Sequence, residues 1–158
     1  MRDHAWLQTQ LDHLLQGHFA DMERPNAITI AFGRQADRRL GSIRMSRDKR
    51  ESRILINGRF RDEEIPVEIV HATIAHELCH YAHGFCSPLP KKYKSPHAGG
   101  IIERELRKRE LGLLCEFEKQ WTKNHWPRII GRTVRTPRAP RSKRPSTGPL
   151  LKWILGLQ

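Results

Sequence analysis

Residues 65–84 of the chain read IPVEIVHATIAHELCHYAHG. Their apolar residues recur at the spacing of an amphipathic helix. The acidic residues 62–64 come just before them and suit a helix N-terminus, and Pro66 suits the first turn. Gly84 is a residue type that commonly ends a helix. The sequence therefore predicts a helix that begins near residue 65 and ends near residue 83.

The predicted helix contains the pattern HExxH, with His76 and His80 as its histidines and Glu77 as its glutamate. Positions i and i+4 lie one turn apart on the same face of a helix, so both imidazoles can reach one metal ion. Glu77 lies on the adjacent flank, where its carboxylate can accept a proton from a metal-bound water. The pattern predicts a zinc site with Glu77 as the base. The alternative is a pair of histidines that binds no metal.

The helical wheel places the two histidines opposite the apolar side of the helix. That apolar side is made of Val67, Val70, Ile74, Leu78 and Tyr81. The small residues Ala72 and Thr73 lie above the histidines on their own side. We therefore expect the apolar side to pack in the core and the histidines to face a cleft. Cys79 lies beside the site but points off the His76 direction, and we expect it to be a packing residue rather than a ligand.

A catalytic zinc usually has three protein ligands and one open position. The sequence offers three candidates for the third ligand: His97, His83 and Cys86. His97 follows a Pro-rich loop and precedes the next predicted helix. His83 lies at the helix end, from which its reach to the same ion is poor. Cys86 stands where metzincins place a third histidine, but His83 replaces the glycine that they need. We therefore prefer His97.

The other elements predict an α+β fold. Residues 3–20 have apolar residues at helical spacing, and residues 28–32, 40–46 and 53–57 read as short strands. Polar linkers separate the strands, so an antiparallel meander is the simplest arrangement. Residues 100–121 are expected to form one further helix. Its inner stripe is made of Ile102, Leu106, Leu113, Phe117 and Trp121.

The chain has 158 residues and a formal net charge of +12, and most of that charge lies near its end. Residues 119–158 contain ten basic and no acidic residues, whereas residues 1–118 contain 19 basic and 17 acidic ones. We therefore expect a domain over residues 1–126 and a basic Pro/Arg-rich tail over residues 127–158. The tail ends in a short apolar patch, residues 150–157.

Positive charge of this density suits binding to the phosphate backbone of nucleic acid. Trp121, Trp126 and Trp153 are candidates for stacking on the bases of a single strand. The alternative is a solvated tail, or one that binds any polyanion. The residues expected to carry the nucleic-acid contact are Arg128, Arg132, Arg135, Arg138, Arg141, Lys143 and Arg144.

Cysteine content and the N-terminal residues indicate an intracellular protein. Cys79, Cys86 and Cys115 form no CxxC pair and are too few and too widely spaced for a secreted disulfide framework. Residues 1–16 hold no uninterrupted apolar run of the kind found in signal peptides, and no stretch reaches the roughly 20 apolar residues that span a bilayer. We expect a cytoplasmic location, with a nucleoid-associated or nuclear one as the alternative.

The motif HELCH, the loop after it and the segment SPHAGGIIERELRKREL at residues 95–111 resemble the SprT-like metallopeptidase domain. In that family HExxH is followed, after a variable loop, by an element of the type His-Gly-x-x-Phe that opens the next helix. His97 matches its histidine. The glycine is displaced by one or two positions, and Ile101 stands where an aromatic residue is usual. The order of elements before the motif is also similar, so the resemblance covers residues 5–121.

The resemblance implies a minimal zincin fold in which His76, His80 and His97 hold zinc and Glu77 is the base. SprT-like proteins include the Spartan-type proteases, which degrade proteins crosslinked to DNA. In those proteases, DNA binding by neighbouring basic segments controls the peptidase. Many members carry a four-cysteine zinc ribbon after the catalytic helices, whereas in this chain the basic tail occupies that place.

Two functions follow as hypotheses. The first is a zinc endopeptidase, in its finer form one that acts on DNA-bound or DNA-crosslinked proteins. In it Glu77 deprotonates the attacking water and protonates the leaving amine, and Tyr93 is the candidate oxyanion stabiliser. The second is a nucleic-acid-binding protein whose HExxH metal site is structural or degenerate. Lys91, Lys92 and Lys94, on the loop between the ligands, either attract an acidic partner to the cleft or are simply solvated.

Overall fold

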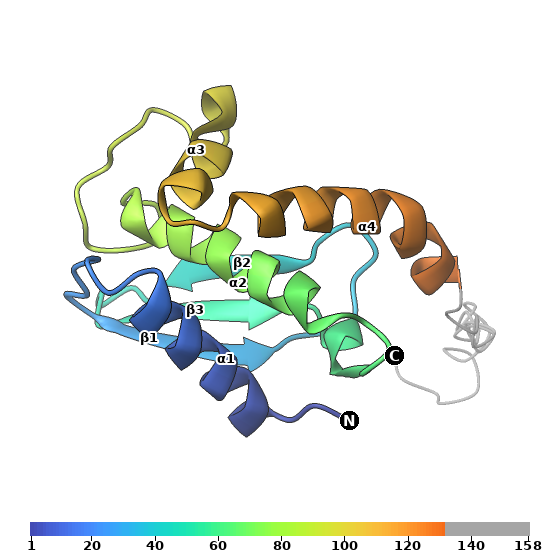
Figure 1. Ribbon diagram of the computed structural model, residues 1–158. Helices are drawn as coiled ribbons and strands as arrows, with labels where there is room; N and C mark the ends of the chain where they lie inside the picture. Colours follow the sequence, from blue (N-terminus) through green and yellow to red (C-terminus); the bar gives the residue numbers. More distant parts are fainter. Residues whose placement is uncertain (132–158) are drawn as a thin grey trace, which may run out of the picture.

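The structure, a computed structural model, describes residues 1–131, and residues 132–158 lie outside that range. Over residues 1–131 it has four α-helices and a three-stranded mixed sheet. This α+β arrangement, expected from the sequence, is compatible with a minimal zincin-like fold. The elements in chain order are α1 (His4–Gly17), β1 (Ala27–Phe32), β2 (Gly41–Met45), β3 (Glu51–Ile56), η1 (Gly58–Arg61), α2 (Val67–Ala82), η2 (Ala98–Gly100), α3 (Ile101–Lys108) and α4 (Gly112–Gly131). Figure 1 shows α2 running across the sheet, with α4 packed against α2.

The C-terminal end of α2 confirms the stop predicted at Gly84. Gly84 has a φ of 78°, and its N–H donates to the Tyr81 carbonyl at 3.0 Å. The N–H of Phe85 donates to the His80 carbonyl at 2.9 Å. These two bonds form a Schellman motif, which satisfies carbonyls at the helix end. A Cβ at position 84 would lie 2.3 Å from the Pro90 carbonyl oxygen, so glycine is required where the following loop folds back.

The strand order β1-β3-β2 differs from the predicted antiparallel meander. β2 and β3 form an antiparallel hairpin in which Ile43 lies opposite Ile54. β1 instead runs parallel to β3, with Ile30 opposite Ile54, so the expectation of an antiparallel sheet is wrong for this pair. The reason is that residues 33–40 are long enough to cross the end of β3 before β2 begins. Their polar composition marks a linker but does not reveal the crossing.

Asn57 holds the crossing segment, residues 33–40, in place. Its buried side-chain amide donates to the carbonyls of Ala36 and Arg39, both at 2.7 Å. Its backbone N–H donates to the Leu40 carbonyl at 2.8 Å. Carbonyls that turn inward need such partners. Asn57 therefore fixes the backbone that leads into β2.

Trp126 of α4 also holds the crossing segment, residues 33–40. Its Nε1–H donates to the Asp37 carbonyl at 2.8 Å, and its ring meets that of Phe60 edge-on, with centroids 5.8 Å apart. Trp126 is 6% exposed. The suggestion that it stacks on nucleic-acid bases is therefore wrong, because the ring is already used in packing. Trp121 is half-buried and stacks on His125.

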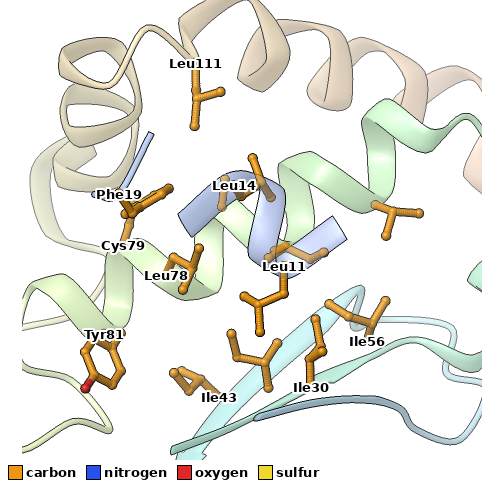
Figure 2. Packing of buried hydrophobic residues seen from close by; sticks show 14 of the residues in the cluster. Leu11, Leu14, Phe19, Ile30, Ile43, Ile56, Leu78, Cys79, Tyr81 and Leu111 are labelled. Carbon is orange, nitrogen blue, oxygen red and sulfur yellow. The ribbon is translucent and has the colours of Figure 1, made fainter. Parts of the chain in front are cut away.

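The core lies between α1, α2 and the sheet (Figure 2). Leu11 of α1 and Leu78 of α2 gather there with Ile30, Ile43 and Ile56 of the three strands. Each side chain is at most 8% exposed. The apolar side predicted for α2 is in this core apart from the half-buried residue 67, and the opposite side of α2 is also largely covered. The part of α2 that carries His76 and His80 is therefore packed on most of its circumference.

Cys79 is fully buried, as predicted for a packing residue, and burial raises the pKa of its thiol. A thiol whose thiolate form is disfavoured in this way is a poor metal ligand and a poor nucleophile. Cys79 therefore belongs to the core and not to the site, although it lies within the HExxH motif.

The single helix predicted over residues 100–121 is two helices, α3 and α4. Glu110 separates them with a φ of 62°, and the N–H of Leu111 donates to the Leu106 carbonyl at 2.8 Å. A Schellman-type end is thus built on a non-glycine residue, at a cost of about 1–2 kcal/mol. Because the helix is interrupted, residues after the break no longer lie on the predicted inner face. Leu113, expected on that face, is 84% exposed.

α4 continues through Pro127 to Gly131, so the first residues of the predicted tail are helical. Arg128 is exposed there. The boundary between a domain over residues 1–126 and a tail over residues 127–158 stays a prediction, since most of the tail lies outside the described residues. Within residues 1–131 no helix is both long and apolar enough to cross a membrane.

Candidate metal centre

Three histidines lie together beside the sheet although one of them is distant in sequence. One ring nitrogen each of His76, His80 and His97 lies within 4.8 Å of the other two. The ring centroids are 4.8 Å apart for His76 and His80, 5.5 Å for His76 and His97, and 4.7 Å for His80 and His97. The structure therefore brings together the three residues that the sequence proposes as metal ligands.

The chemistry of these imidazoles fits a metal ion. The Nδ1 atom of His80 is buried and has no hydrogen-bond partner within residues 1–131. Burial, together with repulsion from neighbouring histidines, lowers the pKa of both His76 and His80 to about 4. Both rings are therefore neutral at neutral pH, which is the form that binds a metal. Zinc, with Zn–N bonds of about 2.0–2.1 Å, would draw the three nitrogens closer together.

The histidines lie at a hollow of about 790 Å³ between α2, β2 and the loop that follows α2. His76 is half-buried and His97 is exposed, so the site can be reached from solvent. Within the described residues β2 lies at an edge of the sheet, and its residues 41–44 line the hollow. Another hollow, of about 890 Å³, lies between α4 and residues 58–65 and contains none of the three histidines.

Glu77 is 7% exposed and lines the same hollow. Burial raises the pKa of its carboxyl to about 7, against the opposing effect of the Arg39 guanidinium. A carboxyl group with a pKa near 7 suits a general base at neutral pH. A bound dication would lower this pKa, because it favours the charged carboxylate. Glu77 therefore stands beside the proposed ligands as a group able to accept a proton.

Neither alternative third ligand joins the three histidines. His83 is fully buried, and its Nε2 lies 3.4 Å from a carboxylate oxygen of Glu105. Cys86 is exposed and lines the hollow, but it does not belong to the group of possible ligand atoms found within residues 1–131. The ring of Tyr93 meets that of His83 edge-on, with centroids 4.8 Å apart, and it is not among the described residues that line the hollow. The structure therefore gives no support to Tyr93 as an oxyanion stabiliser.

Two consecutive glycines let the chain turn from His97 into α3. Gly99 and Gly100 have φ values of 60° and 68°, in the left-handed region that glycine enters without steric cost. A Cβ at position 99 would meet nothing within 4 Å, so its requirement for glycine comes from the backbone alone. The glycines after His97 thus have a structural role in placing this side chain.

Arg109 anchors α3 and with it the position of His97. Its guanidinium pairs with Glu105 at 2.9 Å and with Asp21 at 2.7 Å, and it donates to the His18 carbonyl at 2.7 Å. Burial would raise the pKa of Glu105, but Arg109 and His83 hold it below its usual value. The carboxylate therefore stays charged and links α3 to His83 at the end of α2, while Arg109 links α3 to the segment after α1.

Among solved structures, the chain resembles the metallopeptidase zymogen of Methanocaldococcus jannaschii jannalysin. The two sequences are 17% identical, the match covers 85% of this chain and 100% of that chain, and the TM-score is 0.44. No protein-family model matches the sequence. No curated protein matches it either. The case for a function therefore rests on the geometry of the site.

Gly41, the first residue of β2, lets the strand and α2 meet at Glu77. A Cβ at position 41 would lie 2.7 Å from Cγ2 of Thr73 and 3.0 Å from Oε1 of Glu77. Thr73 is buried, and its hydroxyl donates to the Ile69 carbonyl at 2.8 Å. Glycine inside a strand often marks such a close approach. Sequence reasoning missed this residue, because the signal does not say which group approaches.

Proposed function

We propose that this chain is a zinc-dependent endopeptidase of the SprT-like type. The observation that supports the proposal is the convergence in one hollow of three imidazoles able to bind zinc and the buried carboxylate of Glu77. Three protein ligands with one open position are typical of catalytic zinc, whereas structural zinc usually has four. The HELCH motif followed by a loop and by His97 at the start of the next helices supports the SprT-like assignment.

Zinc held by the three histidines would supply a Lewis acid for a peptide carbonyl and a water of lowered pKa. Glu77 would take the proton from the attacking water and deliver it to the leaving amine. Its burial against Gly41 and Thr73 keeps the carboxylate in one position, so little ordering is needed during the reaction. Arg39 lies close enough to favour the charged form of Glu77, which is the form that accepts the proton.

The edge of β2 gives an extended peptide a place to bind. An extended peptide can add to an exposed strand through main-chain hydrogen bonds. A peptide placed along β2 would pass the three histidines, since residues of β2 and the histidines line the same hollow. The proposed substrate is therefore an unfolded or flexible segment of a protein.

The finer proposal is that the peptidase binds nucleic acid and acts on DNA-bound or DNA-crosslinked proteins. It is supported by the ten basic residues, unaccompanied by acidic ones, over residues 119–158. Among the basic residues named for this contact, Arg128 lies within the described range and is exposed, and the others lie outside it. The alternative function, a nucleic-acid-binding protein with a structural or degenerate metal site, draws on the same charge.

Zinc removal tests the proposed function. Metal-free protein should cleave unfolded casein no faster than background, and added zinc should restore cleavage, because both the Lewis acid and the acidified water come from the metal. The measurement is the release of acid-soluble peptides, with zinc content determined on the same sample. Zinc-loaded, folded protein that cleaves neither casein nor a DNA-binding protein in the presence of single-stranded DNA would favour the binding protein instead.

Replacing Gly41 with alanine adds a methyl group that overpacks the contact between β2 and α2. The rate of casein cleavage should fall about tenfold or more, and the free energy of unfolding should fall by about 1–3 kcal/mol. Circular dichroism melting and initial rates measure the two effects. Gly33→Ala is the matched control, since a Cβ there would meet its nearest atoms at an ordinary 3.7 Å.

Thr73→Ser provides a further control for Gly41→Ala. It removes Cγ2, the atom nearest the added methyl, and keeps the hydroxyl. The double variant should recover much of the stability while its activity stays low, because the contact with the Glu77 carboxylate remains. Full recovery of activity in the double variant would contradict the positioning role of Gly41.

A further inference from the structure

The hollow around the three histidines has a cationic rim. Its basic side chains are Arg38, Arg39, Arg44 and Lys91. All four are exposed, and none takes part in an ion pair within residues 1–131. The acidic side chains that line the hollow within the same range are Glu77, already assigned as the base, and the half-buried Glu118. The rim therefore carries an excess of positive charge directly beside the proposed metal ligands.

Arg38 and Arg39 lie at one end of the hollow on a fixed backbone. Asn57 holds the Arg39 carbonyl, and Arg38 and Arg39 line the same hollow as Glu77. The carboxylate of Asp37, next in sequence to Arg38, pairs with Arg59 at 2.7 Å. It therefore does not neutralise the two arginines. The backbone that carries Arg39 is therefore fixed beside the hollow.

Arg44 and Lys91 lie toward the other end. Met45, the last residue of β2, is paired with Ser52, whose hydroxyl donates to the Cys86 carbonyl at 2.8 Å. This bond joins that end of the sheet to the loop after α2, which carries Lys91. Gly41, at the opposite end of β2, meets Glu77. The two cationic pairs therefore lie toward the two ends of the strand that passes the site.

The length of β2 determines which positions of a bound peptide lie near the cations. At about 3.3 Å per residue, β2 (Gly41–Met45) spans about 13 Å, and a peptide beside it would present about two residues on each side of its cleaved bond. We propose that the hollow selects peptide segments with acidic side chains on both sides of the scissile bond. This inference rests on the proposed peptidase function and names its substrate class. The four cations line the same hollow as the metal ligands, so a substrate bound there would lie beside them.

A set of three matched peptide substrates tests the inference. Three quenched fluorescent peptides of equal length share one central sequence and carry Asp/Glu, Asn/Gln or Lys at the flanking positions. The zinc-loaded full chain should cleave the acidic peptide with a kcat/KM about tenfold above that of the neutral one, and the lysine peptide most slowly, as expected for several partly exposed charge pairs. The preference should weaken as salt is raised, because salt screens exposed charges.

A charge variant assigns the preference to the rim. Arg38→Gln, Arg44→Gln and Lys91→Gln are combined, while Arg39 is kept because it acts on Glu77. This variant should bring the acidic-to-neutral ratio of kcat/KM close to one. The matched control combines Arg47→Gln, Lys108→Gln and Lys123→Gln, three exposed residues outside the hollow with the same loss of charge. The control should keep the preference.

The outcomes separate the inference from the function on which it rests. Three outcomes overturn the inference but leave the proposed peptidase function intact. They are equal cleavage of all three peptides, a preference for the lysine peptide, and an acidic preference that survives in the rim variant. Inhibition by single-stranded DNA that the rim variant abolishes, without an acidic preference, overturns it and assigns the rim to nucleic acid. Failure of the same zinc-loaded sample to cleave casein overturns the peptidase, and the inference with it.

Discussion

Replacing Glu77 with glutamine should slow peptide hydrolysis by about a hundredfold or more, because a general base contributes at least that much. Glutamine has nearly the same shape but cannot accept the proton from the attacking water. Zinc content should not change, since the three proposed ligands are untouched. Initial rates on casein and metal analysis of the same preparations measure both effects. Turnover that survives the substitution would mean that another group is the base.

The same substitution should change the pH dependence of stability in the metal-free protein. Burial raises the pKa of Glu77 from 4.5 to about 7, so the folded wild type binds more protons than the unfolded chain between these values. The wild type should therefore lose stability relative to Glu77→Gln as the pH rises from 4.5 to about 7. Denaturant melts at several pH values measure the difference.

Glu118→Gln is the matched control for the activity measurement. Glu118 lines the same hollow and undergoes the same chemical change, but it has no assigned role in the reaction. It should keep most of the activity. A loss of activity equal to that of Glu77→Gln would show that removing any carboxylate from the hollow has the same effect. The specific role of Glu77 would then be contradicted.

Replacing His97 with alanine should weaken zinc binding by more than about a hundredfold, because even the outer-shell partners of zinc ligands are worth about 10–100-fold in affinity. His97 is exposed, so the metal-free protein should melt at nearly the wild-type temperature. The increase in melting temperature that zinc gives to the wild type should be lost, since that increase follows from ligand binding to the folded state. Zinc titration and thermal melts measure the two quantities.

Cys86→Ser is the matched control for His97→Ala. Cys86 is the other exposed candidate ligand at the hollow, and its substitution should leave zinc affinity unchanged. Loss of zinc in Cys86→Ser together with retention in His97→Ala would reverse the assignment of the third ligand.

Local patterns in the sequence indicated which histidines the structure brings together, and the reasons are physical. The helical spacing of His76 and His80, and the stop at Gly84, depend on residues close together in the chain. The proximity of His97 depends on tertiary structure, yet its place between a Pro-rich loop and the next helix was enough to prefer it. The structure brings it to the other two histidines.

The parts that the sequence did not predict depend on contacts between distant segments or on unusual backbone. The parallel pairing of β1 with β3 requires residues 33–40 to cross the end of β3, and the bonds that hold this segment come from Asn57 and Trp126, which lie farther along the chain. The break after α3 falls at Glu110, a left-handed residue that is not glycine, so its usual signal is missing. The contact of Gly41 with Glu77 joins two elements that no local pattern connects.

Zinc X-ray absorption spectroscopy of the metal-loaded protein is the most direct test of the central claim, that His76, His80 and His97 hold zinc with one position open. The account predicts three imidazole nitrogens and one further oxygen at about 2.0–2.1 Å, and the loss of one imidazole in any zinc that His97→Ala retains. A sulfur ligand at about 2.3 Å, or an imidazole count that His97→Ala leaves unchanged, would contradict it.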